Sequence, residues 1–96
     1  MQSESNSKNY IRPSQVERDF YNNAIPGYLE WVPGISLENK FLLEQNGISK
    51  TDHLVGNFFF LERDEQAFID FLIELKIEKS DAVMCARSFA RKFGSL

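Results

Sequence analysis

The sequence predicts an all-α fold, a small compact domain of five helices that contains a helix-hairpin-helix element. Two features lead to this prediction. Residues that cap helices recur along the chain, and apolar residues in its C-terminal third repeat at the spacing of three and four that is typical of helices. The one segment rich in strand-forming residues would have no sheet to join. A length of 96 residues corresponds to one domain.

The N-terminal segment, residues 1–12, contains three serines and two asparagines with few apolar side chains. Because such a composition cannot bury enough apolar surface to order the chain, we expect a flexible tail there. The helical domain is predicted over residues 13–96.

The first helix is predicted to begin after Ser14 and to run to about Asn22. Ser14 and Glu17 fit a capping box, in which the hydroxyl accepts from the backbone N–H three residues on and the carboxylate reaches back. A turn and then a short helical or 3₁₀ segment, residues 28–31, lead to the hairpin. We expect Trp31 to anchor the hairpin by packing against it.

The hairpin of the predicted helix-hairpin-helix element spans residues 32–36, an apolar residue and a Pro-Gly turn followed by isoleucine and serine. Gly34 would let the main chain approach a flat partner, and Ser36 caps a helix over residues 37–46 that closes at Gly47. The first N–H groups of such a helix lack partners and lie at the positive end of its dipole, so the site suits an anion such as a DNA phosphate. A Pro-Gly pair before a capped helix is also an ordinary turn, and the pentapeptide alone leaves both interpretations open.

A third helix is predicted from Thr51 to about Phe59, behind an N-cap at Ser49. Residues 54–61 are dense in aromatic and β-branched side chains, which favour a strand by propensity. Since an isolated strand would have no partner, we expect a helix that ends in an extended apolar segment.

The fourth helix is predicted to start after Asp64 and to run to about Lys76. Its apolar stripe follows helical spacing and consists of Phe68, Phe71, Leu72 and Leu75. Ile69 and Ile73 lie outside this stripe. A helix that is apolar on more than one face packs against more than one surface, so we expect part of a subunit interface here.

The last helix is predicted to start after Ser80. Its buried stripe consists of Ala82, Ala86, Phe89, Ala90 and Phe93. Arg87 and Arg91 point elsewhere. The net charge of −3 has the wrong sign for binding nucleic acid by bulk electrostatics, but residues 76–92 carry five basic and two acidic side chains, whereas residues 28–75 carry nine acidic and three basic ones. A solvated helix face is the commoner explanation of such a basic run.

The composition argues against an enzyme. Cys85 and His53 are the single cysteine and the single histidine, and they give neither a zinc spacing nor a nucleophile and base. The acidic side chains have no catalytic partner or phosphate-binding loop beside them, so no catalytic residue, metal or cofactor is predicted. One cysteine, no apolar run long enough for a membrane and no signal peptide together predict an intracellular protein.

A set of residues keeps a particular order, with almost no gaps, over about four-fifths of the chain: Ser14, Gln15, Arg18, Asp19, Phe20, Gly34, Ile35, Leu43, Glu44, Gly47, Lys50, Gly56, Phe58, Leu61, Asp64, Glu65, Phe68, Leu72, Cys85, Arg87 and Phe93. With this set the chain resembles the barrier-to-autointegration factor family of small dimeric chromatin proteins. The resemblance implies a homodimer that binds and bridges double-stranded DNA without reading its sequence, in the nucleus and cytoplasm.

The resemblance and the free N–H groups at helix starts together indicate the DNA contacts. The predicted set consists of Ser14, Gln15, Gly34, Ile35, Ser36, Glu38, Asn39, Lys40, Lys79 and Ser80. The subunit and partner interface that the resemblance implies consists of Gly56, Asn57, Phe58, Phe60, Leu61 and Ala67. In the family a groove across the dimer receives the LEM domain of inner-nuclear-membrane proteins, so LEM-domain-like proteins are expected partners.

Several positions depart from the family pattern in ways that weaken a DNA site. Val16 replaces a lysine that touches phosphate, and Ser36 replaces the second glycine of the hairpin. Phe41 and Leu42 replace paired lysines after the hairpin, and Ile77 aligns with the lysine before the final helix. Each lost phosphate contact lowers both the affinity and its salt dependence. The alternative prediction is therefore a dimeric adaptor of the same fold with weakened or lost DNA binding.

Overall fold

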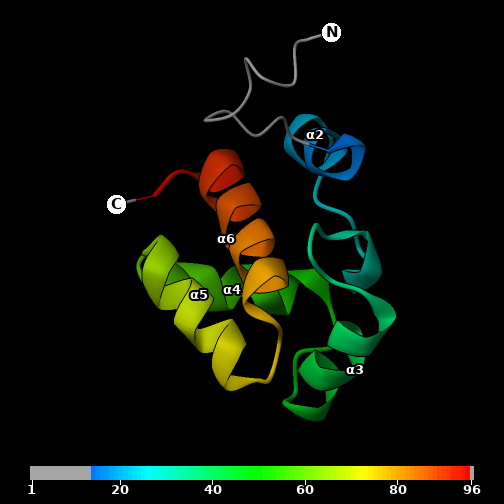
Figure 1. Ribbon diagram of the computed structural model, residues 1–96. Coiled ribbons are helices and arrows are strands. Elements are labelled where there is room, and N and C mark those ends of the chain that lie inside the picture. Colours follow the sequence, from blue (N-terminus) through cyan, green and yellow to red (C-terminus); the bar gives the residue numbers. More distant parts are fainter. Residues whose placement is uncertain (1–13, 96) are drawn as a thin grey trace, which may run out of the picture.

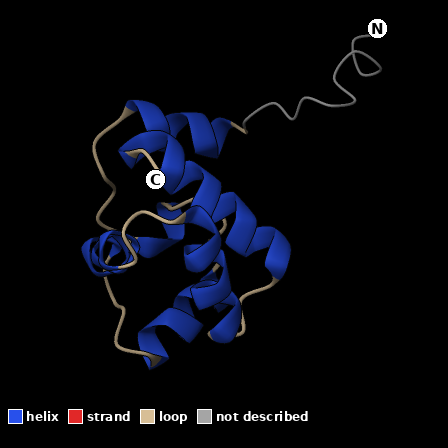
Figure 2. Ribbon diagram, turned by 90° about the vertical axis from the view of Figure 1, so that its left-hand side faces the viewer, coloured by secondary structure: helices blue, strands red, loops and turns tan. Residues whose placement is uncertain are grey.

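The structure, a computed structural model, describes residues 14–95, and all regular secondary structure in that range is helical (Figure 2). In chain order (Figure 1) the elements are α2 (Gln15–Asn22), the 3₁₀ helix η1 (Leu29–Trp31), α3 (Leu37–Gln45), α4 (Thr51–Phe60), α5 (Glu65–Glu74) and α6 (Lys79–Phe93). The predicted all-α class is confirmed for the described residues. The predicted tail, residues 1–12, lies outside them.

Phe89 of α6 lies where most of the other helices meet. The centroid of its ring is 5.3 Å from that of Phe20 in α2, 5.6 Å from that of Phe58 in α4 and 5.2 Å from that of Phe68 in α5. All four side chains are buried. In Figure 1, α6 crosses in front of α4, with α5 on one side and α2 and α3 on the other. The core is therefore assembled around α6.

Three predicted helix caps are present. The side chains of Ser14, Ser36 and Asp64 accept hydrogen bonds from the N–H three residues on, at 3.2, 3.1 and 2.9 Å. The capping box is complete, because the Ser14 N–H also donates to Glu17 Oε1 at 2.9 Å. These local bonds satisfy N–H groups that the helices themselves leave unpaired, which explains why the sequence locates the three starts correctly.

Two predicted caps are wrong. The last helix begins two residues earlier than expected, with Glu78 as its N-cap, and Ser80 lies inside its first turn. The cause is tertiary: Ile77 is buried and its N–H closes the end of α5 by donating to Leu72 O at 3.2 Å, which leaves only Glu78 before α6. Likewise α4 is capped by Lys50 rather than Ser49, without a side-chain hydrogen bond.

The segment after α4 is a turn and not the extended apolar segment that the sequence predicts. The helix continues to Phe60, and the chain then reverses through Glu62 and Arg63, whose φ angles are 61° and 57°. The Arg63 N–H donates to Phe58 O at 2.9 Å, and its guanidinium donates to Phe93 O at the end of α6 at 3.1 Å. These bonds hold the left-handed residues in place.

A buried ion pair joins α2 to α6. Glu17, which is 4% exposed, accepts from Arg87 at 2.7 Å and 3.2 Å. Burial by itself would raise the pKa of Glu17, but the Ser14 N–H and the Arg87 guanidinium stabilise the carboxylate more, so the pKa is lowered from its ordinary value of 4.5. Arg87 thus points away from the buried stripe of α6, as predicted, and toward α2.

Replacing Glu17 by glutamine should destabilise the protein at neutral pH by about 1 to 3 kcal/mol, because Arg87 loses its charged partner. Since the pKa of Glu17 is lower in the folded state, this stabilisation is present above the ordinary carboxyl pKa and is lost as pH falls through the folded value. The difference in melting temperature between the two proteins, followed by circular dichroism, should therefore shrink as the pH falls below the ordinary carboxyl pKa of 4.5. Glu44→Gln, which removes an exposed carboxylate of α3, is the control; a difference independent of pH would contradict the assignment.

Candidate nucleic-acid interface

The hairpin, residues 32–36, connects η1 to α3 by a tight turn. The Ile35 N–H donates to Val32 O at 3.0 Å and closes the turn, and Gly34 has a φ of 85°. Ser36 then caps α3. In the part of the chain that the structure describes, the N–H groups of Leu37 and Glu38 in the first turn of α3 have no acceptor. This helix start can therefore receive an anion.

Gly34 is needed for packing inside the domain, which corrects the expectation that it opens the main chain to a partner. A Cβ at this position would lie 2.4 Å from Asp81 O and 3.1 Å from Cys85 N, both in the backbone of α6. Only glycine lets the hairpin approach α6 so closely. The hairpin is thus fixed to the central helix of the domain.

The side chains of Ile35 and Asn39 face the interior, although both positions were predicted as DNA contacts. Ile35 is part of the hydrophobic core, and Asn39 is 6% exposed. The Asn39 amide donates to Gly34 O at 2.9 Å and to Asp81 Oδ2 at 3.0 Å, so it ties the hairpin to α6. These two residues shape the site, and their side chains are not available to a ligand.

The packing brings the start of α6 next to the hairpin. Asp81, which contacts both Gly34 and Asn39, directly follows Lys79 and Ser80, and these two residues are exposed. At the start of α2 both Ser14 and Gln15 are also exposed, but they have partners: Gln15 Nε2 donates to Asp19 Oδ1 at 2.8 Å, and Ser14 forms the capping box. The hairpin and the start of α6 are therefore the two predicted segments that the fold joins most directly.

The charges beside the hairpin are nearly balanced. The Lys40 ammonium lies 3.2 Å from Glu30 Oε1, an ion pair that lacks a well-aligned hydrogen bond. The backbone N–H of Glu30 and the Lys40 charge lower the pKa of this carboxyl. Glu38 is exposed close to the free N–H groups. Lys40 is therefore partly neutralised. Lys79 is the basic side chain of the predicted set that forms no ion pair among the described residues.

Apolar side chains are exposed around the same helices. Leu37 and Phe41 of α3 are 68% and 67% exposed, one turn apart on the same face. Trp31 is 64% exposed, so the prediction that it anchors the hairpin by packing is wrong. Its place in the core is taken by Leu29 and Val32, which are buried on either side of it.

The residues predicted for the subunit interface divide into exposed and buried ones. Phe60 is 83% exposed and Gly56 is exposed, whereas Asn57, Leu61 and Ala67 are half-buried. Phe58 is fully buried in the core of the domain, so its side chain cannot form part of an interface.

Three further apolar side chains near this surface also differ in exposure. Ile69 is buried, while Ile73 on the next turn of α5 is 38% exposed. Phe59, beside Phe60 in α4, is 49% exposed. The second apolar face of α5 is therefore smaller than the sequence suggests, because Ile69 packs inside the domain.

The family model for barrier to autointegration factor matches residues 12–93. The chain belongs to the barrier-to-autointegration factor family. A search of curated proteins and a search of solved structures each give no match. The family is a non-enzymatic family of DNA-binding proteins. In residues 14–95 no cluster of side chains could hold a metal ion, and no helix is both long and apolar enough to cross a membrane.

Replacing Gly34 by alanine should destabilise the fold by about 2 to 4 kcal/mol, because the new Cβ meets the α6 backbone in addition to the strain of a positive φ. Gly47→Ala is a matched control. Its φ is 82°, yet a Cβ there would meet nothing within 4 Å, so only the conformational term of about 1 kcal/mol should remain. Unfolding in denaturant measures both values, and equal losses would show that Gly34 is not needed for packing.

Proposed function

We propose that the protein is a homodimer that binds the phosphate backbone of double-stranded DNA without reading its sequence, and that bridges two duplexes. The proposed contacts are the hairpin and the adjoining helix starts, that is Ser14, Gln15, Gly34, Ile35, Ser36, Glu38, Asn39, Lys40, Lys79 and Ser80. Membership of a DNA-binding family supports the class of ligand. The role of Gly34, Ile35 and Asn39 in this proposal is to fix the backbone of the site.

The observation that carries the proposal is the junction of the hairpin with the start of α6. Free N–H groups of Leu37 and Glu38 lie at one helix start, and Lys79 lies at the other, held together through Asp81. Backbone N–H groups at a helix start bind phosphate without regard to base sequence. Because few cations accompany them, we expect weak binding with a shallow dependence on salt.

The proposed dimer interface lies at the C-terminal part of α4 and the neighbouring face of α5. Phe60 is the most exposed large apolar side chain among the described residues, and Phe59 and Ile73 are also exposed. Burying such a surface against a second copy would remove it from water. The two-fold symmetry of a dimer would then point two hairpins at two duplexes.

A second candidate function is a dimeric adaptor that binds other proteins and has weakened or lost DNA binding. The observation that favours it is the exposure of Leu37 and Phe41 on α3 and of Val16 on α2. Val16 and Phe41 occupy positions where the family carries lysines. The groove of a dimer near Phe60, Leu61 and Ala67 would be the place for a LEM-domain-like partner.

Lys79→Ala should weaken binding to a random-sequence duplex about fivefold to tenfold and lower the slope of log affinity against log salt by about one. Arg91→Ala is the control, because this exposed cation lies on the same helix about 18 Å further along its axis. Fluorescence anisotropy with a labelled duplex at several salt concentrations measures both. Gly34 is unsuitable for this test, since a side chain there disturbs the fold.

Two results would count against DNA binding at the hairpin. Equal losses for Lys79→Ala and Arg91→Ala would mean that the start of α6 is not part of the site. If the unmodified protein fails to bind duplex at low salt, the adaptor is the better description.

The unmodified protein should have twice the mass of one subunit by light scattering at micromolar concentration. Phe60→Asp should give a folded monomer, because it places a charge in the proposed interface at a position that does not support the core. Phe41→Asp changes a similarly exposed phenylalanine on α3 and should leave the dimer intact. A single-subunit mass for the unmodified protein would contradict the proposal.

A further inference from the structure

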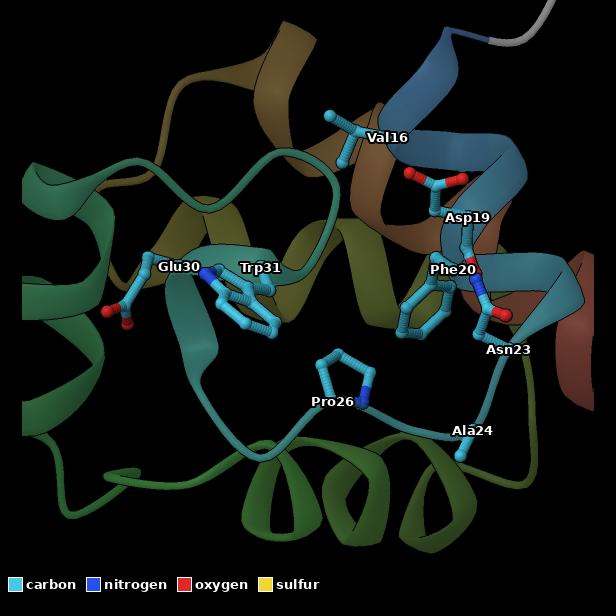
Figure 3. A pocket seen from close by; sticks show the side chains of 8 residues that line it. All are labelled: Val16, Asp19, Phe20, Asn23, Ala24, Pro26, Glu30 and Trp31. Carbon is cyan, nitrogen blue, oxygen red and sulfur yellow. The ribbon is translucent and has the colours of Figure 1, made fainter.

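A cavity of about 490 Å³ lies between α2 and η1, apart from the hairpin N–H groups (Figure 3). It is open to solvent and lined mostly by apolar atoms. Its walls come from Val16 on one side and from Pro26 and Trp31 on the other. None of the proposed DNA contacts lines it, although two of them pair with its lining residues: Gln15 donates to Asp19, and Lys40 forms an ion pair with Glu30.

Trp31 presents the one exposed aromatic face in this cavity. Its ring packs edge-on against Tyr28, with centroids 5.8 Å apart and planes at 69°, and it remains 64% exposed. Phe20 also lines the cavity but is only 3% exposed, because it stacks on Phe89. A flat group that enters the cavity can therefore stack on Trp31, but it cannot be enclosed by several aromatic rings.

The polar groups of the cavity are mainly acceptors. Asp19 has a carboxylate at the rim beside Val16, and only its Oδ1 receives a hydrogen bond from Gln15. The Asn23 amide uses its Nδ2 to donate to Asp19 O at 2.9 Å, which leaves its Oδ1 to accept. Glu30 adds a second negative charge, although its carboxylate is turned away from the cavity (Figure 3) and forms an ion pair with Lys40. None of the described residues that line the cavity is basic.

From this arrangement we infer that the cavity binds an arginine side chain of a partner protein. The guanidinium carries only donors, is planar, stacks on an aromatic face and matches a carboxylate with two parallel hydrogen bonds. It can lie on Trp31 while it donates to Asp19, with its aliphatic stem against Pro26 and Val16. A trimethyl-lysine would need an aromatic cage, and a lysine ammonium would gain less from a single flat ring.

The single tryptophan supplies the readout. In ¹⁵N-labelled full-length protein, the one indole N–H signal should shift and saturate as a blocked Gly-Arg-Gly peptide is added to about 20 mM. A Gly-citrulline-Gly peptide, which keeps the shape but lacks the charge, should give at least fivefold weaker binding, about 1 kcal/mol. Gly-Lys-Gly should also bind more weakly than the arginine peptide.

Asp19→Asn should lower the affinity for the arginine peptide about threefold to tenfold, since it removes the charge that the guanidinium faces. Asp70→Asn is a closely matched control: Asp70 is an exposed carboxylate on α5 that accepts from Gln66 Nε2 at 3.0 Å, as Asp19 accepts from Gln15 at 2.8 Å. It should leave binding unchanged. The ¹⁵N spectrum of each variant shows directly whether it is folded.

Three outcomes would overturn the inference. One is the absence of a saturable indole shift with the arginine peptide. Another is equal binding of the citrulline or lysine peptide, which would mean that the site does not recognise a guanidinium. The third is an equal loss in Asp19→Asn and Asp70→Asn, which would show that the peptide responds to overall charge. None of these results bears on DNA binding.

Discussion

The packing of Phe89 against Phe20, Phe58 and Phe68 is the contact on which the rest of the domain depends. One residue of α6 touches aromatic rings from α2, α4 and α5, so these helices share one core. A domain of this size buries a smaller fraction of its surface than a larger one does, so its stability depends on few core residues such as Phe89. The ion pair of Glu17 with Arg87 and the bonds from Lys92 to Phe20 O and Asn23 O add polar links between α2 and the same helix.

The hairpin depends on α6 just as strongly. Gly34 lies against the α6 backbone, and the Asn39 side chain donates a hydrogen bond to Asp81. These contacts fix the hairpin to α6, and the Asn39 side chain is therefore not available to a ligand. What remains for binding is the backbone at the start of α3 and the exposed start of α6. Such a site has defined geometry and little charge. In the proposed DNA site, the affinity for a polyanion would therefore depend on hydrogen bonds to N–H groups more than on released counterions.

The surface around α3 is less basic and more apolar than a typical DNA-binding surface. Leu37 and Phe41 cover part of α3, and Lys40 is paired with Glu30. The cavity beside η1 is not basic either, because its charged groups are acidic and its exposed aromatic ring is that of Trp31. A surface of this kind suits protein partners with basic side chains, and it can serve them whether or not the hairpin also holds DNA.

The sequence by itself determined the features that arise from local physics. The caps at Ser14, Ser36 and Asp64 and the stripe of α5 could be predicted because capping and helical periodicity involve residues a few positions apart. The family membership could be predicted because the order of the matching residues along the chain is itself a property of the sequence. Tertiary structure decided the rest. The starts of α4 and α6, the exposure of Trp31, and the burial of Asn39, Phe58 and Ile69 all depend on which surfaces meet across the domain. Gly34 illustrates the difference: the sequence indicates a glycine in a turn, but only the distance to Asp81 shows that the missing side chain makes room for α6.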